Sequence, residues 1–167
     1  MTQAANLATV GSNANSGGTL ITSGTAVAST SGTSITFSSI PSWVKRITVM
    51  FNGVGTTGSA ILFQIGSGSV TTSGYASSAL VGNTGGTGNI TSTAGFVHDG
   101  GTGSGIYTLA LIGSNTWVGT GISGSSGTLS WASGNSPALS GALDRVVVTT
   151  VSGTATFNAG SINILYE

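Results

Sequence analysis

The stretch Trp43–Phe51, WVKRITVMF, has the strongest strand pattern in the chain and carries two of its three basic residues. Successive side chains of a strand point to opposite faces, so Trp43, Lys45, Ile47, Val49 and Phe51 share one face. That face is apolar beyond Lys45, which predicts that it packs on a core with Lys45 at the rim of the sheet. The other face points Arg46 outward or toward a partner subunit.

The two basic side chains interrupt an apolar segment that could otherwise pair edge to edge with another copy. A second stretch, Leu143–Val148 (LDRVVV), repeats the pattern of Val44–Val49 (VKRITV) and begins with an acidic residue. If the two stretches form neighbouring strands, Lys45 or Arg46 pairs with Asp144, within the chain or across a subunit boundary. At a solvated rim such a pair contributes only ~0–1 kcal/mol.

The rest of the chain also reads as short strands. The sequence has 29 glycines, and each costs about 1 kcal/mol against alanine inside a helix. Turn signals recur at intervals typical of an all-β sandwich or barrel. The turn Ser152-Gly153 resembles a hairpin tip. The other expected strands are TAVAS from Thr25, TSITF from Thr33, AILFQI from Ala60, NITSTAGFV from Asn89, IYTLALI from Ile106, TWVGTG from Thr116, TLSWA from Thr128, DRVVVTTV from Asp144, TATF from Thr154 and SINILYE from Ser161.

Residues 1–30 differ from residues 31–167 because they contain few large apolar side chains and many Gly, Ser and Asn. Such a segment cannot bury enough apolar surface to offset its ordering entropy. We expect an extended N-terminal arm held against a neighbouring subunit, followed by one β-domain over residues 31–167. The alternative is that the arm adds an edge strand to its own domain.

Charge is scarce: 4% of the residues are charged and the net charge is zero. A nucleic-acid binder or a polybasic membrane patch needs many cations, so both classes are excluded. A surface near zero net charge promotes association, which favours a protein that contacts itself or a larger assembly. The chain has no cysteine and no visible secretory signal, so we expect it to be made in a cytoplasm without disulfides.

The sequence predicts no catalytic, cofactor or metal site, and hence no enzyme. His98 is the only histidine, and its neighbour Asp99 would point to the opposite face of a strand. A calcium site built on Asp99 and loop carbonyls is the weaker alternative to a capped turn. GTGISG, from Gly119 to Gly124, matches a dinucleotide fingerprint, but a turn and a strand follow it rather than a helix.

Aromatic side chains are the remaining candidates for ligand contact, because an indole or phenol ring can stack on a sugar. Trp117 and Trp131 lie next to loop signals and, together with Tyr107, are the predicted glycan platforms. The opposing interpretation is that each is an ordinary core residue. The amides that could add hydrogen bonds are Asn83, Asn115 and Asn135.

Several stretches together resemble a domain of tailed-bacteriophage virion proteins. They are IPSWVKRITVMFNGV from Ile40, GYASSALVG from Gly74, STAGFVHDG from Ser92, and LSGALDRVVVTTVSGTATFNAGSINILYE from Leu139. The resemblance covers about residues 30–167. It implies an antiparallel β-sandwich of jelly-roll type, assembly as a trimer, and no catalytic residues.

The resemblance leads to three functional hypotheses. The first is a capsid decoration, cement or head-fibre protein whose arm binds the major capsid protein and whose domain self-associates on the virion. The second is a tail-fibre or tail-tip module that binds glycan on the host surface. The third is a free carbohydrate-binding module or lectin.

Overall fold

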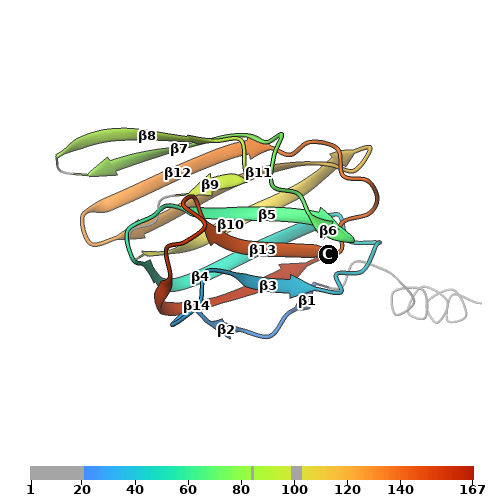
Figure 1. Cartoon of the computed structure of the whole chain (residues 1–167), viewed down its shortest axis with the longest axis horizontal. Helices are drawn as coiled ribbons and strands as arrows, with labels where there is room; N and C mark the ends of the chain where they lie inside the picture. The colour runs from blue at the N-terminus through green and yellow to red at the C-terminus, as the bar shows by residue number, and fades with distance from the viewer. Residues whose placement is uncertain (1–20, 84, 99–102) are drawn as a thin grey trace, which may run out of the picture.

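A computed structural model describes residues 21–83, 85–98 and 103–167, and in these residues the chain forms two packed antiparallel β-sheets (Figure 1). This arrangement confirms the all-β antiparallel sandwich expected from the sequence. No helix in the described part is long and apolar enough to cross a membrane. The strands are β1 Thr22–Ser23, β2 Val27–Ala28, β3 Ile35–Ser38, β4 Arg46–Thr56, β5 Ile61–Ser67, β6 Ser69–Val70, β7 Ala76–Asn83, β8 Gly86–Ser92, β9 Phe96–His98, β10 Gly103–Gly113, β11 Thr116–Ser125, β12 Thr128–Asn135, β13 Arg145–Thr150 and β14 Phe157–Tyr166.

The larger sheet has nine strands in the order β1-β14-β4-β10-β11-β12-β7-β8, with β2 also paired to β14. The smaller sheet has five strands in the order β3-β13-β5-β6, with β9 paired to β5. The chain passes repeatedly between the sheets, for example from β3 to β4 and from β13 to β14. These crossings are compatible with a jelly roll.

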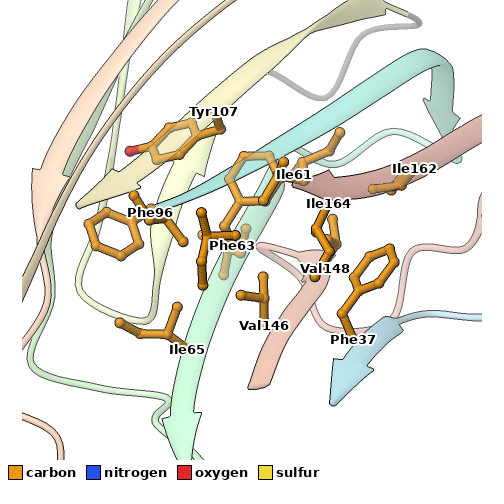
Figure 2. Packing of buried hydrophobic residues seen from close by; sticks show 14 of the residues in the cluster. Phe37, Ile61, Phe63, Ile65, Phe96, Tyr107, Val146, Val148, Ile162 and Ile164 are labelled. Atoms are coloured by element: carbon orange, nitrogen blue, oxygen red, sulfur yellow. The ribbon is translucent and has the colours of Figure 1, made fainter. Parts of the chain in front are cut away.

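The core lies between the two sheets, and aromatic rings fill its centre (Figure 2). The ring centroids of Phe63 and Tyr107 lie 4.7 Å apart, so a strand of each sheet contributes to one contact. Phe96 packs against Tyr107 from the side, at a centroid distance of 5.8 Å. These contacts join the two sheets through large, fully buried side chains, which are the main source of folding free energy in a sandwich.

Strand β4 follows the alternation expected from its sequence. Ile47, Val49 and Phe51 are buried on its inner face, whereas Arg46 and the preceding Lys45 are exposed at the rim. Trp43, expected on the same face, is 49% exposed, because it precedes the strand and lies against Tyr166 instead. The alternation of apolar residues therefore predicted correctly which face of β4 meets the core.

The fingerprint-like glycines of β11 have a packing role. Gly119 and Gly121 lie against the buried ring of Tyr107 on the neighbouring strand β10. A Cβ at Gly119 would lie 2.5 Å from Cε1 of that ring, and a Cβ at Gly121 would overlap the ring and lie 2.8 Å from the carbonyl oxygen of Ile106. Glycine is therefore needed here so that a large ring can lie across a neighbouring strand.

Several details of the strand prediction are wrong. Strands β1, β6 and β7 were not expected, and the expected strand NITSTAGFV is divided into β8 and β9, which lie in different sheets. The expected strand TATF from Thr154 is not a separate strand, because only its last residue, Phe157, is in a strand, as the first residue of β14. The turn at Ser152-Gly153 exists, with the Gly153 N–H donating to the Thr150 carbonyl at 2.9 Å. It does not close a hairpin, because β13 and β14 belong to different sheets.

Part of the expected arm belongs to the domain. Thr22 pairs with Tyr166 and Val27 with Ile162, so β1 and β2 extend the nine-stranded sheet along β14 of their own chain. The Ser29 hydroxyl is buried and donates to the Ala159 carbonyl at 2.7 Å. Over residues 22–29 the edge-strand alternative is therefore the correct one, while residues 1–20 of the expected arm lie outside the described residues.

Candidate functional site

The outer face of the nine-stranded sheet, which points away from the five-stranded sheet, is the candidate functional surface. An apolar row crosses it because the strand register places large side chains side by side. Ile106 pairs with Ile122, Ile122 with Trp131, and Trp131 with Leu80. Met50 continues the row beside Ile106 and is half-buried, while the other four are exposed.

A hydroxyl row runs parallel to the apolar row across six adjacent strands. Each member pairs in register with the next. On each strand the hydroxyl residue lies two positions from the residue of the apolar row, or, on β8, from Asn89, which pairs with Leu80. Hydroxyls both donate and accept hydrogen bonds, so this row can pair with a polar partner without charge. The row consists of Thr48, Thr108, Thr120, Ser133, Ser78 and Thr91.

Trp131 is the shared wall of two hollows on this face. One hollow, of about 450 Å³, lies toward the hairpin tips and is also lined by Asn83, Thr128 and Leu129. The other, of about 320 Å³, is lined on the hydroxyl row by Thr120, Ser133 and Ser78, together with Leu80 and Asn89. All the described residues that line the two hollows are uncharged.

The other two predicted glycan platforms are core residues. Trp117 and Tyr107 are 1% and 0% exposed, so neither ring can reach a ligand at the surface. Trp117 lies on the inner face of β11, and Tyr107 lies under the glycines of the same strand. That part of the glycan prediction is wrong, because the inner faces of β10 and β11 pack on the five-stranded sheet. Trp131 is 46% exposed and remains a candidate glycan platform.

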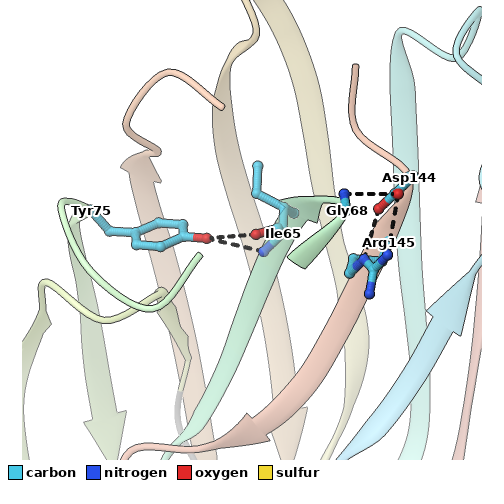
Figure 3. A network of polar contacts seen from close by, with 5 residues as sticks. All are labelled: Ile65, Gly68, Tyr75, Asp144 and Arg145. Atoms are coloured by element: carbon cyan, nitrogen blue, oxygen red, sulfur yellow. Dashed lines mark hydrogen bonds and ion pairs between the residues drawn. The ribbon is translucent and has the colours of Figure 1, made fainter. Parts of the chain in front are cut away.

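All five charged residues of the described part lie at one end of the sandwich, which we call the charged end. Arg46 begins β4 and pairs with Glu167, which follows β14. Asp144 pairs with Arg145, which begins β13, at 2.7 Å between Oδ1 and Nε (Figure 3). The backbone N–H of Lys45 donates to the Glu167 carbonyl at 2.7 Å. Strand β1 runs beside the C-terminal residues, so the N-terminal segment joins the domain at this end (Figure 1).

The ion pairs of one chain differ from the pairing expected from the sequence. Arg46 and Asp144 each have another partner, so the predicted contact of Asp144 with Lys45 or Arg46 is wrong within the chain. The physical reason is that β4 and β13 lie in different sheets and are not neighbours. A sequence echo carries no information about which sheet a strand joins.

Two groups of polar contacts, at Tyr75 and at Asp144, hold the segment between β5 and β7 against β5 and β13 (Figure 3). The Tyr75 hydroxyl accepts from the Ile65 N–H at 3.0 Å and donates to the Thr71 carbonyl at 3.0 Å. Burial raises the pKa of Tyr75 to about 12, so this phenol stays protonated. The Arg145 guanidinium and the Gly68 N–H, which donates at 2.9 Å, hold the pKa of the Asp144 carboxyl below its usual range.

His98 is a core residue rather than an exposed catalytic group. Its ring lies 5.5 Å from that of Phe51 and 6.1 Å from that of Tyr107, in edge-to-face contacts. Its Nδ1 lies 3.4 Å from the Ser123 hydroxyl. Asp99, its candidate partner, lies outside the described residues. Within the described ranges no three His, Cys, Asp or Glu side chains gather as metal ligands.

The hollows contain residues that the sequence analysis missed. Ser78 and Leu80 come from β7, whose only signal was a weak alternation in Ala76–Asn83. Asn89 comes from β8 and begins the expected strand NITSTAGFV, but it was not predicted as a site residue. Of the three candidate amides, Asn83 lines a hollow beside Trp131. Asn115 lies in the β10–β11 turn and Asn135 ends β12, both away from the hairpin tips that flank the larger hollow.

Comparison with known proteins identifies no relative. No protein-family model, no curated protein and no solved structure matches the chain.

Proposed function

We propose that the chain is a non-enzymatic structural protein of a tailed-bacteriophage virion, of the capsid decoration, cement or head-fibre kind. The observation that carries the proposal is the separation of charge on its surface. The charged residues of the described part gather at the end where the N-terminal segment joins, and beyond Arg46 at that end the described outer face of the larger sheet carries no charged residue. A subunit of an assembly needs this separation, because one end anchors while uncharged surfaces pack without repulsion.

The charged end supplies the anchor in this proposal. Ile21, the first described residue, lines a hollow of about 170 Å³ together with Arg46, Tyr166 and Glu167. Residues 1–20 precede Ile21 in the chain, so in this proposal they and the charged end bind the same partner. That partner is the major capsid protein or another virion protein, and the protein lies on the virion surface.

Self-association uses exposed apolar side chains of the outer face that do not line the hollows beside Trp131. Ile106 and Ile112 on β10 and Val118 and Ile122 on β11 are exposed, and neighbouring copies would cover them. The resemblance of the sequence to virion domains implies that three copies assemble. Exposed apolar side chains gathered on one face are typical of surfaces that a partner covers.

Binding to purified shells tests the anchor. The full chain should co-sediment with shells of the encoding phage at a fixed stoichiometry set by the symmetry of the shell. Deletion of residues 1–20 should abolish binding while the domain stays folded. A deletion of residues 1–30 is a poorer test, because it also removes β1 and β2 from their own sheet. Equal binding by the 1–20 deletion would contradict the anchor.

A second candidate function is a tail-fibre or tail-tip module that binds host-surface glycan. The exposed Trp131 between two uncharged hollows favours it. If this function is correct, the purified protein blocks adsorption of the phage to its host, and shells do not bind it.

A further inference from the structure

We propose that Trp131 is the platform of a binding site for a neutral oligosaccharide, and that the chain of sugars runs over its indole from one hollow into the other. Trp131 borders both hollows, and their volumes of about 450 and 320 Å³ fall in the range of small-ligand sites. Of the three tryptophans, it is the one whose ring borders such hollows among the described residues.

The Trp131 ring lies on the outer surface of the sheet, over the neighbouring strand. Trp131 lies on the outer side of β12, where its neighbours Ser130 and Ala132 point inward and are buried. The edge of its ring, at Cζ3, lies 3.6 Å from the position that a Cβ would take on Gly82 of the adjacent strand β7. This is an ordinary van der Waals distance, so the ring lies over the neighbouring strand at Gly82.

The chemistry around the ring fits a sugar better than an apolar or ionic ligand. One face of a pyranose consists of C–H bonds, which pack on an aromatic face, while its hydroxyls need donors and acceptors at the edge. Asn89, Ser78, Ser133 and Thr120 supply these groups in one hollow. The Thr120 hydroxyl donates to the Ala132 carbonyl at 3.1 Å, so toward a ligand it offers its oxygen as an acceptor.

The absence of charge among the described lining residues selects the class of glycan. An acidic sugar would leave its carboxylate or sulfate without a cation, since every described cation lies at the charged end. The larger hollow lies at the β7–β8 and β11–β12 hairpin tips, and Figure 1 shows these tips at the end opposite the C-terminus. A protein anchored by its charged end would thus present the larger hollow outward.

The test uses the full chain and immobilised hexasaccharides of glucose, galactose, mannose and N-acetylglucosamine, beside their sulfated forms. We expect retention by at least one neutral hexasaccharide and none by the sulfated forms. Trp131→Ala should weaken binding roughly tenfold to hundredfold, as expected for losing the burial of one aromatic ring. Trp43→Ala is the matched control, because Trp43 is similarly exposed (49%) but lies against Tyr166, and its binding should be unchanged.

A second pair of variants tests the polar part of the site. Asn89→Ala should weaken binding, whereas Asn135→Ala should leave it unchanged, since Asn135 lies outside both hollows. Retention by no neutral hexasaccharide, or equal binding by Trp131→Ala, would overturn the proposal. A change of oligomeric state in Trp131→Ala, measured by light scattering, would also overturn it, because the ring would then belong to a subunit interface.

Different experimental results would contradict the glycan site and the structural role. Trp131→Ala should bind shells like the unmodified chain, and deletion of residues 1–20 should leave glycan binding intact. Loss of shell binding alone would contradict only the anchor, and loss of glycan retention alone would contradict only the site at Trp131.

Discussion

The two faces of the nine-stranded sheet use similar side chains for opposite purposes. On the inner face Trp117 and Tyr107 are fully buried and hold the two sheets together. On the outer face Trp131 and Ile122 are about half exposed and contact no second layer of the described structure. Stability is therefore concentrated on the inner face, while the outer face is available for binding.

Glycine marks the same difference. Gly119 and Gly121 are required on the inner face because a ring lies against them, whereas an added Cβ at Gly82 on the outer face would meet the exposed Trp131 ring at 3.6 Å, an ordinary contact distance. Substitutions on the inner face should lower the free energy of unfolding, and substitutions on the outer face should change binding instead. Three substitutions test this division and a fourth tests the charged end, from the largest expected effect on stability to the smallest.

Trp117→Ala should have the largest effect on stability. Removing a fully buried indole leaves a cavity in the core, and such changes lower the free energy of unfolding by about 3–5 kcal/mol. Urea denaturation followed by far-ultraviolet circular dichroism measures the loss. A loss under about 1 kcal/mol would show that the inner face is not the main source of stability.

Gly121→Ala should destabilise the protein by about 1–3 kcal/mol, because the added methyl group overlaps the Tyr107 ring and the backbone of β10. Gly88→Ala on the edge strand β8 is the matched control, since nothing lies within 4 Å of its added Cβ. Thermal unfolding should show a lower midpoint for the first variant and an unchanged midpoint for the second. Equal midpoints would contradict the role assigned to Gly121.

Trp131→Ala should change the free energy of unfolding by less than about 1 kcal/mol, because its half-exposed ring contributes little to the core. The same urea measurement, made beside Trp117→Ala, gives the contrast between the faces directly. A loss as large as that of Trp117→Ala would show that the outer tryptophan is structural.

Asp144→Asn should have the smallest effect, about 0–1 kcal/mol, because the pair with Arg145 is solvated. The pKa of Asp144 is lower in the folded protein than in the unfolded chain. Its contribution is therefore present above the unfolded pKa and is lost as the pH falls through the folded pKa. Unfolding curves at neutral and strongly acidic pH should differ more for the unmodified chain than for the variant, and an equal acid loss in both would exclude this carboxyl as a source.

The sequence predicted those parts of the fold that depend on local alternation. Strand β4 has apolar residues at every second position, so its inner face could be assigned from the sequence alone. Strand β7 could not, because Ser, Ala and Gly dominate it and give no clear period. The division of NITSTAGFV between two sheets depends on tertiary contacts that no local pattern encodes.

The candidate site was predictable only in part, for a related reason. Trp117 and Trp131 both lie in strands next to loops, and β11 has apolar residues on both faces. Which face meets the other sheet depends on register across several strands, so only the fold separates the core tryptophan from the exposed one. The predicted ion pair was wrong for a similar reason, because a charge pattern along the chain does not reveal which sheet each strand joins.

Electron cryomicroscopy of virions of the encoding phage tests the proposed function most directly. The account predicts density for the sandwich on the head, with the charged end against the shell and the β7–β8 and β11–β12 hairpins pointing outward. Density at the tail tip alone would contradict the capsid role and favour the second candidate function. Sandwiches bound to the head by their hairpin tips, with the charged end outward, would contradict the anchor.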